Sequence, residues 1–380
     1  MIKFQKISLN DIVIGQPLLW NVMDSSGNLL LSEGYVIENR SQAEALVSRG
    51  MYADQARVET SRKATPHQPK TEPPSAFRSI SLAVKRLGVV LRDIHQLPDA
   101  RERILGVVQM INFAISLDED IALATIQLNQ SSGHYPVRHC VDTAILATLV
   151  ARSMKKTEQE IQDIVAAALT MNISILALQE QLQGRKEALF DDEKVRMHHH
   201  PIASIKILHD AGIEDSDWLN YVLMHHEQAD GSGYPLGSLK SDIPQNVKIL
   251  YLADVFCARI SARGYRNSML PNAALKDIFV ENRAQVDSEL SPYFIKVLGL
   301  YMPGTFVCLK NKEIAVISYR GDMPSRCVAH SLVKPNGDMW GTPVKRDTRE
   351  EPFSIAEAIY PIKASVNVNL QQIWGPLASL

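Results

Sequence analysis

Residues 224–237 read MHHEQADGSGYPLG, and this stretch guides the interpretation of the rest of the chain. His225 and His226 come at the expected end of a helix, about 100° apart around its axis. Both can face one site only if that site lies at the helix end. Asp230 and the glycines after it predict a tight turn, because glycine reaches positive φ without steric cost. A histidine pair alone is usually a solvated helix terminus, but folding needs do not explain the whole string.

The composition is that of an ordinary globular protein. The chain has 380 residues, which suits two or three domains better than one core. Its hydrophobic content is 46% and its charged content 22%. The formal net charge of -2 argues against nucleic acid or an anionic membrane as the main partner. Any anionic ligand must therefore be held by local groups.

The cysteines and the apolar stretches bear on the compartment. The four cysteines are scattered without a CxxC pair, which indicates neither a zinc knuckle nor a disulfide framework. The first residues lack the apolar segment of a secretory signal, and runs such as 144–151 and 164–171 are too short to span a bilayer. We expect a cytoplasmic protein without membrane insertion.

Changes in apolar spacing divide the chain into four parts. Residues 1–59 predict a small β-rich regulatory domain. Its predicted elements are extended runs at 12–14, 18–22 and 29–31, a turn at 25–28 and a short helix at 42–48. Residues 60–76 contain four prolines and almost no aliphatic side chains, which indicates a solvated linker.

The remaining two parts set the fold class. Apolar residues recur at helical spacing through residues 77–302, whereas residues 303–380 return to short extended runs. The sequence therefore predicts a mainly α protein, with a helical domain between a small N-terminal β-rich domain and a short C-terminal β appendage. The expected helices span 137–153, 158–173, 191–210, 218–226, 245–261, 271–282 and 292–300, and the expected strands 306–309 and 314–317.

The string HHExxDGxGYP resembles the hallmark of the HD-GYP family, part of the HD superfamily. Better-known members of this family are bacterial phosphodiesterases that hydrolyse the second messenger cyclic di-GMP. The resemblance covers about residues 80–300 and implies an HD-type helical domain in a signal-transduction protein. It implies metal ligation by His200, His225 and His226, with His139 and Asp254 as weaker candidates. It also implies substrate contacts by Gly233, Tyr234, Pro235, Arg263 and Arg266.

The chain departs from the family pattern at the consecutive His-Asp dyad. The dyad positions hold Met171 and Asn172, and the lysine that follows in the family is Ile175. Tyr135 stands where some members have an acid. The pair at 209–210 resembles a dyad but comes after His200, so we interpret it as a helix C-terminus followed by a glycine terminator.

These departures affect the two halves of a binuclear site unequally. Two divalent ions about 3.5–4 Å apart need bridging anions, and Asn172 is neutral. Met171 offers a thioether, a poor ligand for hard or borderline divalent ions. We expect the metal position of His139, the dyad and Asp254 to be empty. Three histidines with an open fourth position can bind one divalent ion (Zn, Fe or Mn), and the alternative is no ion at all.

Three hypotheses stay open at this stage. The first is a degenerate HD-GYP protein that binds cyclic di-GMP, a related nucleotide or a partner signalling protein with little or no hydrolysis. The second is an active metal-dependent cyclic di-GMP phosphodiesterase with an altered site. The third is a catalytically dead scaffold for protein interaction. Loss of the dyad argues against efficient catalysis, so whether the chain is an enzyme and which residues are catalytic are not assigned.

Overall fold

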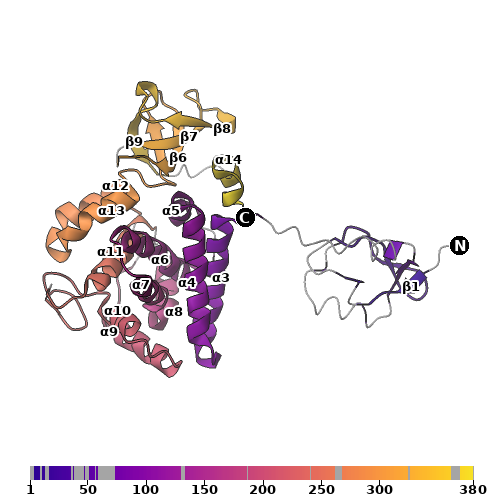
Figure 1. Cartoon of the computed structure of the whole chain (residues 1–380), viewed down its shortest axis with the longest axis horizontal. Coiled ribbons are helices and arrows are strands. Elements are labelled where there is room, and N and C mark those ends of the chain that lie inside the picture. The colour runs from indigo at the N-terminus through magenta and orange to yellow at the C-terminus, as the bar shows by residue number, and fades with distance from the viewer. Residues whose placement is uncertain are drawn as a thin grey trace. The chain divides into compact units, whose positions relative to one another are not determined.

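The computed structural model describes residues 4–8, 11–12, 17–35, 37, 47, 51–55, 57–58, 73–129, 133–185, 187–239, 241–261, 268–323, 326–360 and 369–379. The chain separates into two compact units, Met1–Glu72 and Pro73–Leu380. Each unit is described by itself. Figure 1 labels the helices and strands used below.

The N-terminal unit is built on a small antiparallel sheet with strand order β1-β4-β2-β3. Its core contains Trp20, Val22, Ile37 and Met51. The strands are β1 (Phe4–Lys6), β2 (Val22–Met23), β3 (Leu29–Leu31) and β4 (Tyr52–Asp54). The predicted β-rich character of this unit is confirmed.

Two local predictions in this unit have clear outcomes. The turn at 25–28 forms, with the Asp24 carboxylate accepting the backbone N–H groups of Ser26 and Asn28. The strand expected at 18–22 is wrong except at its last residue, although Leu18 and Trp20 are buried. Most of the expected strand at 12–14 and of the helix at 42–48 lies outside the described residues.

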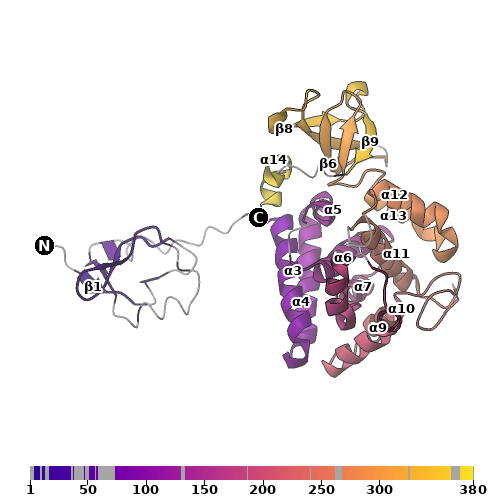
Figure 2. The ribbon, with the colours of Figure 1, turned by 180° about the vertical axis from the view of Figure 1, so that it is seen from behind.

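The second unit begins with a helical domain that holds the main hydrophobic core. Helix α6 lies at its centre, is buried along nearly its whole length, and packs against α7, α11 and α3. Figures 1 and 2 show the long α3 and α4 side by side along one flank. The helices are α3 (Ala76–Asp93), α4 (Ala100–Leu117), α5 (Glu119–Leu128), α6 (Tyr135–Ser153), α7 (Glu158–Thr170), α8 (Leu176–Gln183), α9 (Asp191–Asp210), α10 (Ser216–Met224), α11 (Gln245–Ile260), α12 (Pro271–Lys276) and α13 (Ser291–Leu298).

Two helices end at other residues than the sequence predicts. Helix α7 starts with a capping box between Thr157 and Glu160, as the sequence suits. It ends at Thr170 and is followed by the 3-10 turn η3 (Ile173–Ile175), so the helix expected at 158–173 is shorter. The helix expected at 218–226 begins earlier and ends at Met224, which leaves both adjacent histidines beyond its last turn.

The apolar run that begins at residue 164 is longer than the sequence reading allowed for. Glu158–Gln183 has the length and composition of a membrane-crossing helix, but 78% of its most apolar window is buried within the protein. The structure divides this run into α7, η3 and α8. Burial of this kind is what the central helices of a helical domain require.

A five-stranded antiparallel sheet follows the helices, with strand order β8-β7-β6-β5-β9. The first two strands lie where the sequence predicts strands, and β6 runs three residues further. The strands are β5 (Phe306–Leu309), β6 (Ile314–Arg320), β7 (Cys327–Val333), β8 (Met339–Asp347) and β9 (Ile355–Ile359), and the short helix α14 (Leu370–Trp374) follows. Figure 2 shows the sheet at one end of the helical domain.

One arginine joins this sheet to the helices. Arg320, the last residue of β6, forms ion pairs with Asp120 and Glu119 in the first turn of α5 and donates to the carbonyl oxygen of Val297.

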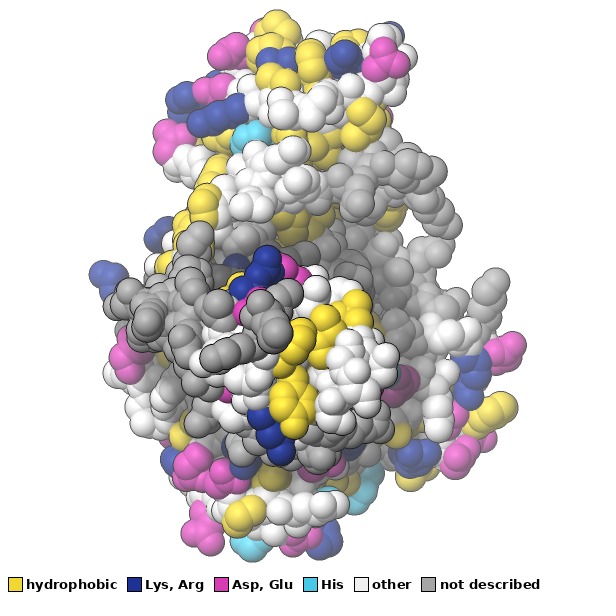
Figure 3. All heavy atoms as spheres, turned by 90° about the vertical axis from the view of Figure 1, so that its right-hand side faces the viewer, with side chains coloured by type: hydrophobic (Ala, Val, Ile, Leu, Met, Phe, Trp, Pro, Cys, Tyr) yellow, Lys and Arg dark blue, Asp and Glu magenta, His cyan; other side chains and the backbone are white. Residues whose placement is uncertain are grey.

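The charged side chains on the described surface are dispersed. On the described part of the face in Figure 3, Lys and Arg side chains are mixed with Asp and Glu, in keeping with the formal net charge of -2.

Candidate metal centre

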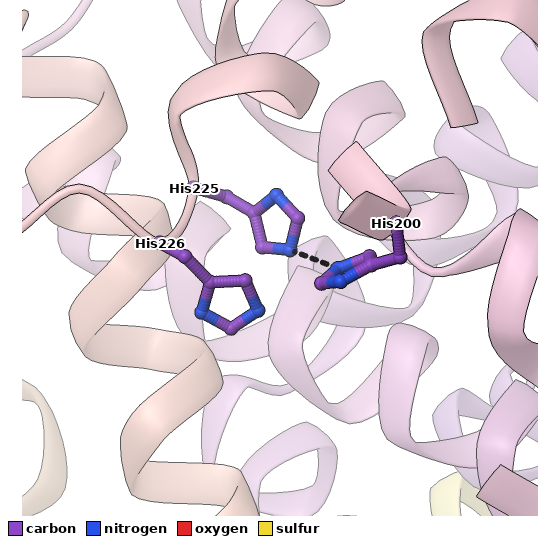
Figure 4. A group of neighbouring side chains, drawn as sticks. All are labelled: His200, His225 and His226. Carbon is purple, nitrogen blue, oxygen red and sulfur yellow. Dashed lines mark hydrogen bonds between the residues drawn. The ribbon is translucent and has the colours of Figure 1, made fainter. Parts of the chain in front are cut away.

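Three histidines converge where helices α9 and α10 pack against each other. His200 lies near the middle of α9, His225 is the capping residue that ends α10, and His226 follows it. Helix α10 ends here because the N–H of Glu227 turns back to the carbonyl oxygen of Met224 at 2.8 Å. Figure 4 shows the His200 ring opposite the rings of His225 and His226. The structure thus brings together the three residues predicted as ligands.

The hydrogen bonds of two rings fix which nitrogen faces the cluster. Nδ1 of His200 lies 2.5 Å from the carbonyl oxygen of Met197, and Nδ1 of His225 lies 2.7 Å from that of Val222. A carbonyl oxygen only accepts, so both Nδ1 atoms carry hydrogen, and in the neutral rings both Nε2 atoms carry a lone pair. The two Nε2 atoms are 3.0 Å apart. Two facing lone pairs repel each other unless a cation lies between them.

Burial keeps these imidazoles neutral. It lowers the pKa of His200 to about 3, and the neighbouring His225 lowers it further. Burial likewise lowers the pKa of His225 and places that of His226 well below its usual value. A proton is therefore a poor bridging cation at neutral pH, whereas neutral imidazole is the form that binds metals. One ligand atom from each histidine lies within 4.8 Å of the other two, close enough to surround one ion.

A second buried pair borders the cluster. Nε2 of His139, on α6, lies 2.7 Å from Oδ1 of Asp254, on α11. Burial alone would raise the pKa of Asp254, but the hydrogen bond to His139 and the nearby imidazoles outweigh it, so the pKa is lowered. The carboxylate in turn opposes the lowering of the pKa values of the three clustered histidines. The negative charge of Asp254 therefore acts electrostatically on all three histidines.

The positions that the sequence analysis assigns to the dyad and its lysine carry apolar or neutral side chains. Met171 is fully buried in the main core, and Ile175 packs in a small cluster with Leu178 and Leu182. Asn172 is also buried. Neither Met171 nor Ile175 brings a charge or a nitrogen to the centre. Within the described part of the chain, the three histidines form the one group of three or more side chains suited to hold a metal ion.

The loop after the histidines is tied down by Glu227. Its carboxylate accepts hydrogen bonds from the backbone N–H groups of Leu236 and Ser238, both at 2.7 Å. Glu227 is only 2% exposed. The acid of the HHE triplet thus closes the loop back on its own start, so its role in this structure is to shape the loop.

Gly233 and Tyr234 bring the same loop against the histidines. A Cβ atom on Gly233 would lie 2.4 Å from the backbone nitrogen of Gln228 and 2.6 Å from the carbonyl oxygen of His226. Tyr234 donates its N–H to that same oxygen at 3.2 Å. Its ring stacks on the His226 ring with the centroids 4.6 Å apart. Glycine is needed here for close approach, and tyrosine then contacts a predicted ligand.

The other predicted site residues are placed as follows. Pro235 follows Tyr234 across a cis peptide bond in the same loop. Arg263 and Arg266 lie outside the described residues. Tyr135 stacks on the His139 ring at 5.7 Å. The pair at 209–210 ends α9 and is exposed, with the glycine after it at φ 79°, as the sequence interpretation has it. Which of these residues bind metal or substrate stays a prediction.

Two residues of the site were missed by the sequence reasoning. Ser174 donates to the carbonyl oxygen of His200 at 3.0 Å and contacts Ser204 at 2.9 Å, which anchors η3 to α9. The His198 ring stacks on Tyr234 with centroids 4.5 Å apart. The run of three histidines at 198–200 was a visible signal. However, positions two apart lie on nearly opposite sides of a helix, so helical spacing alone does not indicate that His198 and His200 serve one site.

Comparison with known proteins places this arrangement in a family. The family model described as HD domain matches residues 119–290, which include all five predicted metal ligands. Among curated proteins, cyclic di-GMP phosphodiesterase PdeB of Borreliella burgdorferi is 26% identical over 49% of this chain and 49% of its own length. The cyclic di-GMP phosphodiesterase response regulator RpfG of Xanthomonas campestris is 32% identical over 36% of each chain.

A solved structure has the same fold. The protein Bd1817 of Bdellovibrio bacteriovorus, an HDG"Y"P protein, matches with a TM-score of 0.52 and 16% identity, over 78% of this chain and 99% of that one. A cyclic di-GMP phosphodiesterase of Pseudomonas aeruginosa is 24% identical over 56% of this chain and 50% of its own length. The chain spans about half the length of the first curated relatives it matches. The match to the HD domain, the similarity to these relatives and the loop packed on the histidines agree with one another. The chain is therefore a mainly helical member of the HD-GYP family.

Proposed function

We propose that this chain is a bacterial cyclic di-GMP signalling protein whose HD-GYP domain binds the nucleotide, or a related one, with little or no hydrolysis. The observation that carries the proposal is the unequal state of the two halves of the centre. His200, His225 and His226 are assembled with neutral, inward-facing nitrogens. The dyad positions hold Met171 and Asn172.

The three-histidine cluster fits one divalent ion. The fit rests on the two Nε2 lone pairs that face each other at 3.0 Å and on the lowered pKa values that keep the rings unprotonated. Imidazole nitrogens suit Zn, Fe or Mn. When bound, such an ion supplies a Lewis acid and lowers the pKa of bound water. The protein contributes His200 and His225 as pre-oriented donors, because backbone carbonyl groups hold both rings.

A second ion has much weaker support from the residues. Two divalent ions about 3.5–4 Å apart repel by on the order of 15 kcal/mol at an effective dielectric near 20, and bridging anions must offset this. Asp254 is the one carboxylate among the predicted ligands, and it already pairs with His139. Asn172 adds no charge. Without the second ion and the family's lysine, charge developing on a phosphodiester has little stabilisation.

The nucleotide class is proposed from the relatives and from the predicted arginines. The relatives' names include cyclic di-GMP phosphodiesterases and, in Vibrio cholerae, a 3'3'-cGAMP-specific phosphodiesterase. Arg263 and Arg266 would suit the phosphates, since a guanidinium group can form paired hydrogen bonds to them. We further propose signalling proteins as partners and a cytoplasmic location, which the free state of Cys140, Cys257, Cys308 and Cys327 supports.

An active enzyme is the second candidate. The observation in its favour is the His139–Asp254 pair, which keeps two family ligand types in contact at the border of the cluster. In that case an altered second metal position would form around these two side chains. The two candidates differ in the number of ions bound and in turnover.

One set of measurements on the purified full chain separates the candidates. Elemental analysis counts the bound metal, calorimetry measures cyclic di-GMP binding, and chromatography follows its hydrolysis. We expect one divalent ion per chain, nucleotide binding and negligible turnover. Two ions with turnover would establish the active enzyme instead. A chain that binds neither metal nor nucleotide would leave only a protein-interaction scaffold.

Restoring the lost residues provides the stricter test. In the triple variant Met171→His, Asn172→Asp and Ile175→Lys, we expect a second bound ion and hydrolysis that the parent chain lacks. The matched control carries the same three changes plus His225→Ala, which removes a ligand from the other half. If the triple variant gains neither metal nor activity, then the assignment of the dyad to these positions is wrong.

A further inference from the structure

The His226 ring is held differently from the other two rings of the cluster. The Nδ1 atoms of His200 and His225 bond to backbone carbonyl oxygens. Across the described residues, the ring nitrogens of His226 make no such bond. The His226 ring instead contacts three rings: His225 at 4.2 Å, tilted by 43°, His200 at 5.0 Å, edge-on, and Tyr234 at 4.6 Å with an interplanar angle of 25°. Of these three, Tyr234 is the ring that lies outside the histidine cluster and stacks on His226 face to face. The orientation of one of three predicted ligands therefore depends on where the Tyr234 ring lies.

The backbone of Tyr234 is fixed from the loop side. Its N–H bonds to the carbonyl oxygen of His226, and Gly233 lies too close to the chain before it to carry a side chain. Glu227 ties the end of the loop. None of these contacts sets the rotation of the tyrosine side chain, because they all act on the backbone.

Within the cluster the tyrosine ring also meets the His200 ring edge-on, with centroids 6.3 Å apart. From outside the cluster it contacts the His198 ring. The two rings stack with centroids 4.5 Å apart and an interplanar angle of 23°. His198, Tyr234 and His226 thus form a ring stack in which Tyr234 contacts both histidines. His198 is exposed, whereas His200, two residues along the same helix, is 1% exposed. One turn of α9 therefore supplies both a predicted ligand and a ring outside the ligand set.

The supporting helix is itself anchored next to the cluster. Ser174, in η3, donates to the carbonyl oxygen of His200 and contacts Ser204. Helical geometry sets the spacing of the His198 and His200 backbones, and the Ser174 contacts hold this part of α9 against η3. Movement of α9 would therefore shift both rings together.

We propose that His198 is a positioning residue for the metal centre, acting through Tyr234 on the orientation of His226. This inference rests on the proposed metal site and goes beyond it, because His198 neither contacts the cluster nitrogens nor belongs to the recognised motif. His198 acts through stacking of its flat ring on the Tyr234 ring, and not through its ring nitrogens. A phenyl ring at this position should therefore serve as well as an imidazole ring.

The test uses Co²⁺ as the probe, on the full chain. The variants are His198→Ala, His198→Phe and the control His199→Ala, an adjacent exposed histidine on the same helix. Affinity comes from chelator competition, and the visible absorption of the bound ion reports the ligand arrangement. Alanine has a higher helix propensity than histidine, so the alanine variants are expected to keep α9 folded.

We expect His198→Ala to weaken Co²⁺ binding about 3- to 10-fold and to change the absorption spectrum. This loss of affinity corresponds to the free energy of one aromatic stacking contact. His198→Phe should restore the affinity and the spectrum, and His199→Ala should match the parent chain. Equal behaviour of His198→Ala and His199→Ala would overturn the inference alone. Failure of phenylalanine to restore binding would also overturn it, because the ring face would not be what matters. A parent chain that takes up no Co²⁺ would refute the proposed metal site itself.

Discussion

Replacing Gly233 with alanine tests how the motif loop supports the centre. The added methyl group would lie 2.4 Å from the backbone nitrogen of Gln228 and 2.6 Å from the Cα atom of Glu227. These are backbone atoms, so no side-chain rotation relieves the contact. The φ angle of Gly233 is outside the left-handed region, so the missing space is the reason for glycine here.

The loss of free energy of unfolding in Gly233→Ala can be estimated from the loop contacts that must shift. Overpacking of this kind costs about 1–3 kcal/mol. Shifting the loop also weakens the bond from the Tyr234 N–H to the His226 carbonyl oxygen, worth about 1 kcal/mol. We therefore expect a loss of about 2–4 kcal/mol, borne mainly by the loop. Because Tyr234 and His226 move apart, metal affinity should fall at least 10-fold.

The assay combines Co²⁺ titration with urea unfolding of the same samples. Gly106→Ala is the matched control, because the site lies within α4 and a Cβ atom there meets nothing within 4 Å. That substitution should raise the free energy of unfolding by about 0.5–1 kcal/mol and leave metal affinity unchanged. The same substitution thus has opposite expected signs at two positions. Unaltered Co²⁺ affinity in Gly233→Ala would refute the role assigned to the loop.

Three further predictions concern other ionisable side chains. Glu227→Gln should weaken both bonds to loop amides and speed hydrogen exchange there at least 10-fold, since bonds to a charged group are worth about 1.5–3 kcal/mol each; unchanged exchange would contradict this. Burial raises the pKa of Asp142 to about 8, against the pull of Arg138, so the folded carboxyl keeps a proton that the unfolded chain loses. Stability contributed by that proton is present below pH 4 and lost as pH rises to about 8, so the advantage of Asp142→Asn in thermal unfolding should grow by about 4 kcal/mol between pH 5 and pH 8, at about 1.4 kcal/mol for each pH unit; a pH-independent difference would count against it. Asp120→Ala leaves the half-buried Arg320 with the exposed Glu119 and the Val297 carbonyl oxygen, and should cost about 2 kcal/mol in urea unfolding, against less than about 1 kcal/mol for the exposed Glu119→Ala.

The adjacency of His225 and His226 at a helix end could be predicted from the local pattern. The addition of His200, from a distant helix, depends on the resemblance to the HD-GYP family. The supporting contacts of the site could not be predicted in this way. Glu227 bonds to amides nine and eleven residues later, and His198 reaches a ring on another segment. Such contacts depend on how the loop folds back, which spacing along the chain does not specify.

The C-terminal sheet shows a second limit of pattern reasoning. Strands β5 and β6 are largely buried and read as apolar runs, so the sequence predicts them. Strand β8 lies at the sheet edge, and its residues MWGTPVKRD are exposed or half-buried without a clear alternation. A strand with little buried surface has no selection for a period of two, and its sequence resembles a loop.

The proposed loss of the dyad is compatible with the packing around Met171 and Ile175. A buried aspartate and a buried lysine need compensating charges, and in a binuclear site metal ions help to provide them. Met171 and Ile175 instead pack with apolar neighbours, so this half of the centre is stable without an ion. The three-histidine half has no such replacement, because the facing Nε2 atoms of His200 and His225 still repel when no cation is bound. Metal dependence should therefore persist in one half of the centre and be absent from the other. This combination suits a protein that holds a ligand better than one that cleaves it.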